Sequence, residues 1–199
     1  MVDGAVRLNR FGWERGKVWS TLVMALAIFA PVILWTQWNN MVSGQEELRA
    51  GSRIILSATP PPMAPSEEGI VSLSIPGNGW TVDTGSSKPA ERVLVHSPMV
   101  VSFSAVAGVK DIGVLFDRKK RDLADGNPSM FTTDVKSYTS PKGLKGLWGD
   151  LTGERYGGAL VVVGRGSVAA VLEVTGPLGH LDGEMDSIHD ILSSLEVST

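Results

Sequence analysis

The stretch GGALVVVGRGSVAAVLEVTG, residues 157–176, decides the fold because it holds two apolar runs separated by a Gly-Arg-Gly turn. Both runs are short and rich in valine, which is typical of buried β-strands. Gly164, Arg165 and Gly166 fall between two strands, whereas a nucleotide-binding glycine loop is followed by a helix. The pattern therefore predicts a β-hairpin and gives no support to a nucleotide site.

Further strand patterns surround this hairpin. The run IVSLSI (70–75) alternates with period two, and the glycines of the following PGNGW turn the chain. The same kind of pattern recurs in ERVLVHS (91–97), MVVSFSAVA (99–107), TTDVKSYTS (132–140) and the region 144–164, which Gly153 interrupts. These runs predict an antiparallel sheet of about six strands.

Two segments have the period of a helix instead. Residues 111–126 start with Asp111, a residue type favoured at helix N-termini, and Pro128 follows as a stop. Residues 181–197 place their apolar side chains on one face. Residues 69–199 are therefore expected to form an α+β domain with two helices beside the sheet.

A long uncharged stretch precedes this domain, since residues 18–45 contain no charged side chain. A helix over residues 18–40 would be long enough to cross the ~30 Å hydrocarbon core with its backbone hydrogen bonds satisfied. Cleavable signal peptides have a shorter apolar region that ends in small residues. Here Trp35 and Trp38 follow instead, so the sequence predicts an uncleaved signal anchor, a single-pass transmembrane helix.

Tryptophans and one proline mark the predicted span. Trp13, Trp19, Trp35 and Trp38 bracket it, as expected for indole rings that prefer the headgroup region. Pro31 removes one backbone hydrogen bond inside the span and predicts a kink, which neighbouring helices can compensate. Pro31 is therefore a candidate contact with other membrane helices.

Positive charge predicts the orientation of the span. Arg7, Arg10, Arg15 and Lys17 all lie in the basic tail, residues 1–17, so the tail is expected in the cytoplasm and the C-terminal domain outside the plasma membrane. The tail has a net charge of +2 and the rest of the chain −5, within a formal total of −3. An acidic external domain gives no reason to expect nucleic acid as a partner.

Residues 41–68 are expected to form a juxtamembrane segment and a proline-rich linker. Pro60, Pro61 and Pro62, with Ser and Glu nearby, favour an extended, semi-rigid spacer. The short β-like run RIIL (53–56) leaves two alternatives open, because it can pair either with the domain or with a partner.

Few residues are candidates for catalysis or metal binding. The chain has no cysteine, which excludes disulfides, a thiol nucleophile, thiolate metal sites and a lipidated cysteine anchor. The motif G-x-S-x-G, which marks many serine hydrolases, is absent. A Ser-His-Asp triad around His96 or another histidine would need no fixed order in the sequence, because it is defined by its geometry in the fold. Possible metal ligands gather near the C-terminus, but their spacing matches no known site, and we interpret them as a solvated helix start: His180, Asp182, Glu184, Asp186 and His189. We therefore expect that the chain is not an enzyme and that it binds no cofactor or metal.

One basic run stands out in the predicted helix 111–126. Arg118, Lys119, Lys120 and Arg121 are consecutive, so a helix spreads them around its circumference, and acidic residues flank them on both sides. The run is either a solvated face or a docking site for an acidic partner or anionic lipid headgroups.

The beginning and end of the predicted domain resemble a known class. The segment LSIPGNGWTVD (73–83) resembles the entry of PsbP-like domains, a superfamily that includes the LpqN family of actinobacterial envelope lipoproteins. LEVTGP (172–177) and IHDILSSLEV (188–197) are similar to their last strand and final helix. The resemblance covers about residues 69–197 and implies a binding or assembly module. This chain departs from the LpqN family in its membrane anchor. LpqN-type proteins are attached by a lipidated cysteine, whereas this chain has no cysteine and is predicted to have a transmembrane helix instead.

These observations lead to two main hypotheses. In the first, the chain is a non-catalytic accessory or assembly subunit of a bacterial membrane protein complex. Its partners are integral membrane protein subunits and the lipid bilayer, and the resemblance suggests the actinobacterial respiratory cytochrome bc–cytochrome oxidase supercomplex. In the second, it is a membrane-tethered module that binds lipid or envelope metabolites, which requires a large apolar pocket. An envelope hydrolase is a third class, for which the sequence shows no motif.

Overall fold

The structure, a computed structural model, describes residues 44–58 and 68–198. The predicted basic tail, the predicted span with its tryptophans and proline, and the proline-rich residues 59–67 lie outside the described residues. In the described part of the chain, no helix has the length and apolar character needed to cross a membrane.

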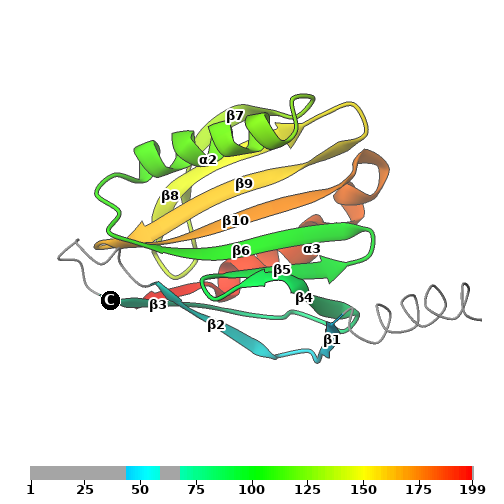
Figure 1. The fold of residues 1–199 in the computed structure, drawn as a ribbon, viewed down its shortest axis with the longest axis horizontal. Coiled ribbons are helices and arrows are strands. Elements are labelled where there is room, and N and C mark those ends of the chain that lie inside the picture. The colour runs from blue at the N-terminus through cyan, green and yellow to red at the C-terminus, as the bar shows by residue number, and fades with distance from the viewer. Residues whose placement is uncertain (1–43, 59–67, 199) are drawn as a thin grey trace, which may run out of the picture. The chain divides into compact units, whose positions relative to one another are not determined.

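The described residues form two sheets and two helices (Figure 1). In chain order the elements are β1 (Gln45–Leu48), β2 (Arg53–Ala58), β3 (Gly69–Ser74), β4 (Trp80–Lys88), β5 (Glu91–His96), β6 (Met99–Ala107), α2 (Ile112–Gly126), β7 (Phe131–Thr139), β8 (Lys145–Thr152), β9 (Tyr156–Arg165), β10 (Val168–Pro177), α3 (Leu178–Ser194) and β11 (Glu196–Ser198).

Eight antiparallel strands make up the main sheet, in the order β1-β4-β5-β6-β10-β9-β8-β7. The predicted hairpin of residues 157–176 is confirmed as β9 and β10 near the middle of this sheet, although its turn is Gly166–Ser167, and Gly164 and Arg165 still belong to β9. Arg165 pairs with Val168 across a two-residue turn, and Gly166 there has a φ of +59°, which glycine adopts without steric cost.

The second sheet has three strands in the order β11-β3-β2. Arg53 of β2 donates to the Ser72 hydroxyl on β3 over 2.8 Å and pairs with Glu196 on β11. Glu196 also accepts from Lys142 over 2.7 Å. These contacts join the last strand of the chain to the two strands from its N-terminal part.

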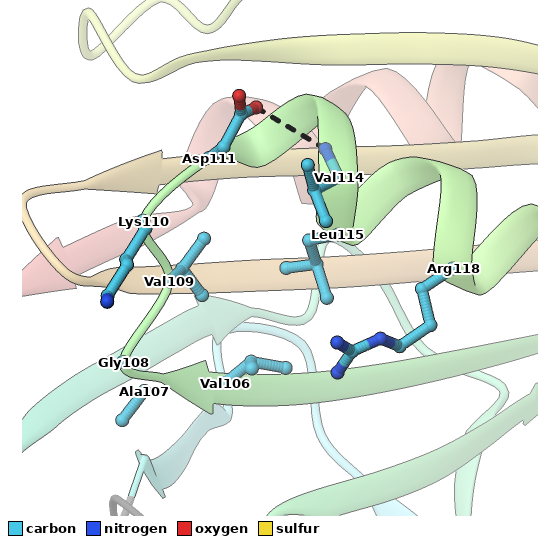
Figure 2. A pocket seen from close by; sticks show the side chains of 9 residues that line it. All are labelled: Val106, Ala107, Gly108, Val109, Lys110, Asp111, Val114, Leu115 and Arg118. Carbon is cyan, nitrogen blue, oxygen red and sulfur yellow. Dashed lines mark hydrogen bonds between the residues drawn. The ribbon is translucent and has the colours of Figure 1, made fainter. Parts of the chain in front are cut away.

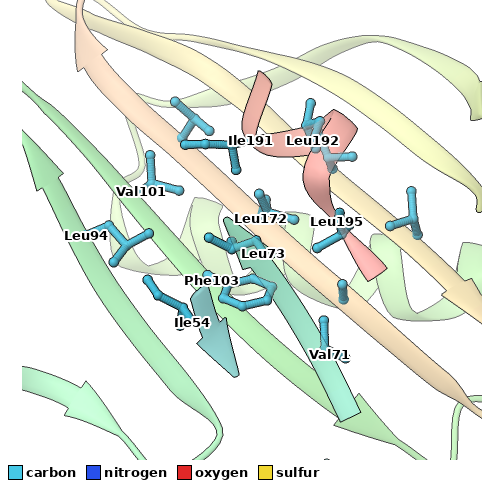
Figure 3. Packing of buried hydrophobic residues seen from close by; sticks show 14 of the residues in the cluster. Ile54, Val71, Leu73, Leu94, Val101, Phe103, Leu172, Ile191, Leu192 and Leu195 are labelled. Carbon is cyan, nitrogen blue, oxygen red and sulfur yellow. The ribbon is translucent and has the colours of Figure 1, made fainter. Parts of the chain in front are cut away.

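The main sheet is covered on both faces, which explains its mostly apolar central strands. The second sheet and α3 pack against one face, where Leu73, Phe103 and Leu172 are fully buried (Figure 3). Helix α2 lies over the other face (Figure 1). Leu160 and Val171 on this face belong to the same core as the apolar side of α2. Successive residues of β10 alternate between these two cores, as the pleat of a strand requires.

The prediction of about six strands was too low. Three strands were missed because each lacks a sustained apolar alternation. Strand β1 consists of mostly exposed, charged residues, β11 is only three residues long, and β4 buries only Trp80 and Val82 before a bulge interrupts its pairing with β5. These strands are held by backbone pairing to their neighbours rather than by burial of a whole face.

Part of the segment predicted as a linker belongs to the folded unit. Strand β1 pairs with β4, and β2 pairs with β3, so the described residues of the domain begin at Gly44 rather than at residue 69. Of the two alternatives for the run 53–56, the structure shows pairing with the domain. Ile54 and Leu56 point into the core, while Ile55 between them is exposed.

The helices lie close to their predicted positions. Helix α2 begins after Asp111 and ends at Gly126, as expected. Helix α3 starts three residues before the predicted boundary and ends at Ser194, because the chain then extends to pair with β3 as β11.

Candidate functional site

Helix α2 is held on the main sheet by a polar cap and an apolar face. The Asp111 carboxylate accepts hydrogen bonds from the backbone N–H groups of Gly113 and Val114 at 2.6 and 3.3 Å. Leu115 and Phe116 are buried against the sheet. The ring of Phe116 reaches Gly149 of β8, where an added Cβ would lie only 2.8 Å from it. The helix position is therefore defined by close packing.

Two cavities lie along one side of this helix. The residues of α2 and its N-cap Asp111 that line each cavity recur at intervals of three, one and three, which places them on one side of the helix. We call this face the α2 strip: Asp111, Val114, Leu115, Arg118, Lys119, Asp122, Leu123 and Gly126.

The first cavity, the N-terminal pocket, lies between the start of α2 and the end of β6. It has a volume of about 270 Å³ and is lined by residues 106–110 and the first four residues of the α2 strip. Lys110 and Arg118 lie on opposite sides of it, with Val106, Val109 and Leu115 between them (Figure 2). The pocket thus combines an apolar floor with two cationic side chains at its rim.

The second cavity, the C-terminal pocket, lies between the end of α2 and the strands β9 and β10. Its volume is about 500 Å³. Besides the last four residues of the α2 strip, it is lined by Asn127, Met130, Tyr156, Glu173 and Thr175. Tyr156 is 52% exposed although it is aromatic, so this pocket presents apolar surface next to carboxylates.

Glu173 is the most unusual ionisable group of the site, because it stands on a central strand of the sheet. Burial raises the pKa of its carboxyl above the usual range, Lys119 acts in the opposite direction, and the Glu91 carboxylate raises the pKa further. Glu91 itself accepts a hydrogen bond from Ser102, the residue that pairs with Glu173 across the strands. A partly buried acid of this kind is a good acceptor for a donor on a bound molecule.

The structure divides the predicted basic run into two pairs. Arg118 lines the N-terminal pocket and Lys119 lines the C-terminal pocket, whereas Lys120 and Arg121 are exposed and lie outside both linings. None of the four, nor Lys110, forms an ion pair with another described residue. Arg118, Lys119 and Lys110 are therefore available to a ligand on the strip side of the helix.

The histidines that the sequence singled out lie against aromatic or solvent-exposed surroundings. His96 stacks on Trp80 with ring centroids 4.9 Å apart, and its Nδ1 lies 3.3 Å from Glu184 without hydrogen-bond geometry. His189 stacks on Trp148 with centroids 6.0 Å apart. His180 is exposed. Among the side chains that the structure describes, no group of three or more His, Asp or Glu is arranged to hold a metal ion.

The region between the two sheets is a packed core. Leu94, Val101 and Phe103 of the main sheet have no exposed surface, and Leu195 after α3 fills the space beside them (Figure 3). The large apolar pocket required by the lipid-binding hypothesis is not found around these described core residues. A cavity of about 640 Å³ lies between β2 and β4, where Ile54, Ile55 and Val82 line it together with polar and charged side chains. The N-terminal and C-terminal pockets lie beside α2, on the face of the main sheet that is turned away from the second sheet.

Comparisons with known proteins show that the fold of this chain is similar to that of a solved structure. No protein-family model and no curated protein matches the sequence. The solution structure of cyanobacterial PsbP (CyanoP) from a Synechocystis species matches 75% of this chain and 94% of its own, with a TM-score of 0.51 and 12% identity. The predicted resemblance to PsbP-like domains is therefore confirmed for the fold.

Two other solved structures are more distant. LpqN, described as involved in cell envelope biogenesis of Mycobacterium tuberculosis, has 15% identity and a TM-score of 0.37, with 78% of this chain and 91% of LpqN covered. A protein from Bacteroides thetaiotaomicron has 15% identity and a TM-score of 0.35, with 65% and 45% covered.

Sequence reasoning found part of this site and missed the rest. It identified the basic run and the Asp111 cap, both of which are local features. It missed Glu173, Tyr156 and the two pockets, because these depend on strands far away in the sequence. One signal was present, since Glu173 is the only charged residue in the apolar run 168–176.

Proposed function

We propose that the chain is a non-catalytic accessory subunit of a bacterial membrane protein complex, and that its PsbP-like domain binds another subunit through the α2 strip. The strip carries this proposal. It combines an exposed Val114 with cations that form no ion pair to another described residue, and the partly buried Glu173 lines the pocket beside it. Arginine and aromatic residues, such as Arg118 and Tyr156 in the linings of the two pockets, are enriched at protein interfaces.

The membrane location is part of the proposal and derives from the sequence. Residues 18–40 form the anchor, the tail 1–17 stays in the cytoplasm, and the domain lies outside the plasma membrane. Because the chain lacks cysteine, single cysteines can report this topology. A membrane-impermeant maleimide added to intact cells should label Glu154→Cys in an exposed turn but not Asp3→Cys. Labelling of both, or of Asp3→Cys alone, contradicts the orientation.

Gentle purification of the tagged, full-length protein from its own membranes tests the accessory role. We expect stoichiometric recovery of integral membrane subunits, identified by mass spectrometry. The actinobacterial respiratory cytochrome bc–cytochrome oxidase supercomplex is the particular assembly to look for, on the strength of the sequence resemblance alone. A chain that migrates only as a monomer after mild detergent extraction contradicts the proposal.

A tethered small-ligand module is the second candidate. The C-terminal pocket favours it, because a volume of about 500 Å³ lies within the range of small-molecule sites. Recovery of the protein alone, with a bound lipid or metabolite, would support this alternative.

A further inference from the structure

We propose that the α2 strip recognises one polypeptide segment of the partner, with a carboxylate at the Lys110–Arg118 end and a cationic or amide side chain at the Asp122–Glu173 end. This inference rests on the proposed function and specifies the chemistry of the segment. It follows from the length, the charge distribution and the apolar surface of the strip.

The length of the strip fits a polypeptide. From Asp111 to Gly126 the helix rises by about 22 Å, at about 1.5 Å per residue. About seven residues of an extended chain cover the same distance. Two separate pockets of about 270 and 500 Å³ lie along this distance, so a single small molecule would fill only one of them.

Opposite charges occupy the two ends of the strip. Lys110 and Arg118 stand at the N-terminal pocket, where the only carboxylate, that of Asp111, already accepts two backbone hydrogen bonds. Asp122 and Glu173 line the C-terminal pocket together with Lys119, so the formal charges of the two linings sum to +1 at the N-terminal pocket and −1 at the C-terminal pocket. A segment with a complementary charge at each end would therefore bind in one direction only.

Apolar groups accompany the charges at both ends. Val114 is 57% exposed beside Arg118, and Tyr156 is 52% exposed beside Glu173. A bound segment would place one apolar side chain on each. An anionic lipid headgroup matches only the N-terminal pocket, because the lining of the C-terminal pocket has a net negative formal charge.

The test uses a photo-crosslinking amino acid in the full-length protein in its own membranes. Placed at Val114, the probe should form an adduct with one partner peptide, and mass spectrometry should find an acidic residue in or next to that peptide. Placed at Lys120, outside both pockets on the same helix, it should form at least about tenfold less of this adduct.

Charge variants sharpen the result. Arg118→Glu should reduce the Val114 adduct about tenfold, because like charges across an interface repel. Arg118→Lys should retain most of it. Lys120→Glu is the matched control, with the same charge change outside the pockets, and should leave the adduct unchanged. An unchanged melting temperature for Arg118→Glu shows that the variant is folded.

Several outcomes would overturn the inference, and they are distinguishable from failure of the proposed function. Equal adducts from Val114 and Lys120, a lipid as the only adduct, or no effect of Arg118→Glu would reject the strip as the docking site. If the wild-type protein still recovers its partner subunits, the accessory role stands with a different contact surface. If it recovers none, the accessory role fails as well.

Discussion

Glu173 shows how a single residue can indicate function in a sheet that is otherwise apolar. It lies on β10, which pairs with β6 on one side and with β9 on the other. The residues before and after it, Leu172 and Val174, are buried and hydrophobic. A carboxyl in such a place costs folding free energy unless a hydrogen bond or an opposite charge compensates its burial. We attribute its presence to the C-terminal pocket of the α2 strip.

Replacement of Glu173 by Gln should stabilise the protein at neutral pH. Folding raises the pKa of this carboxyl, so the folded state binds its proton more tightly, and the free energy of unfolding falls as the pH rises from the unfolded pKa through the folded pKa. The charged form therefore costs stability at pH 7. We expect the melting temperature of the variant to rise by about 1–3 °C at pH 7.

The pH dependence of the melting temperature distinguishes removal of the Glu173 charge from a stabilisation that is independent of protonation. The gain should shrink as the pH falls towards 4.5, the ordinary glutamate value, because the wild-type carboxyl is then protonated too. Glu154→Gln, in an exposed turn, should change the melting temperature little at any pH. A lower melting temperature for Glu173→Gln at pH 7 would mean that the carboxylate has a stabilising partner.

Helix α2 presents the binding strip, and its N-terminal cap holds it in place. Asp111 satisfies two of the N–H groups that have no partner within the first helical turn. The helix has no acidic residue in its first turn and no basic residue in its last turn, so the Asp111 carboxylate is the one favourable charge at its ends among the described residues. The cap and the packing of Leu115 and Phe116 therefore hold the helix on the sheet.

Removal of the cap should cost a measurable part of the stability. We expect Asp111→Ala to lower the free energy of unfolding by about 1 kcal/mol, and Asp111→Asn to lower it much less because an amide oxygen still accepts the N–H groups. Urea unfolding of the detergent-solubilised full-length protein measures both values. Equal losses for the two variants would show that the charge, rather than the capping hydrogen bonds, is what matters.

At the scale of the whole molecule, segments from both ends of the described chain build the layer opposite α2. Strand β2 from the N-terminal part and β11 from the C-terminal part flank β3 in one sheet. Ile54 and Leu56 of β2 and Val197 of β11 all belong to the same core. The core is therefore incomplete until both ends are in place.

Truncation tests this dependence directly. A fragment of residues 44–199 should unfold cooperatively, whereas one of residues 69–199 should not. Without β2 the core loses two large apolar side chains worth about 1.5–3 kcal/mol each, out of a typical total stability of about 5–15 kcal/mol. Circular dichroism during heating distinguishes the two cases. A cooperative transition in the shorter fragment would contradict the structural role of residues 44–58.

The sequence by itself predicted the elements whose side chains repeat a burial pattern. Strands β6, β9 and β10 and helix α2 were found close to their observed bounds, and so was the Asp111 cap, because a strand or helix with a covered face needs apolar residues at a regular spacing. The uncharged residues 18–40 likewise predict an anchor from composition alone, and that prediction remains to be tested.

Only the tertiary structure decided the number of strands and the content of the binding strip. Edge strands such as β1 and β11 are held by hydrogen bonds to a neighbour's backbone, which leave no regular apolar pattern in the sequence. Arg118 and Glu173 lie far apart along the chain, and packing of α2 on the main sheet makes them parts of one surface. Such proximity results from packing between elements that are distant in the sequence, so no local pattern of residues predicts it.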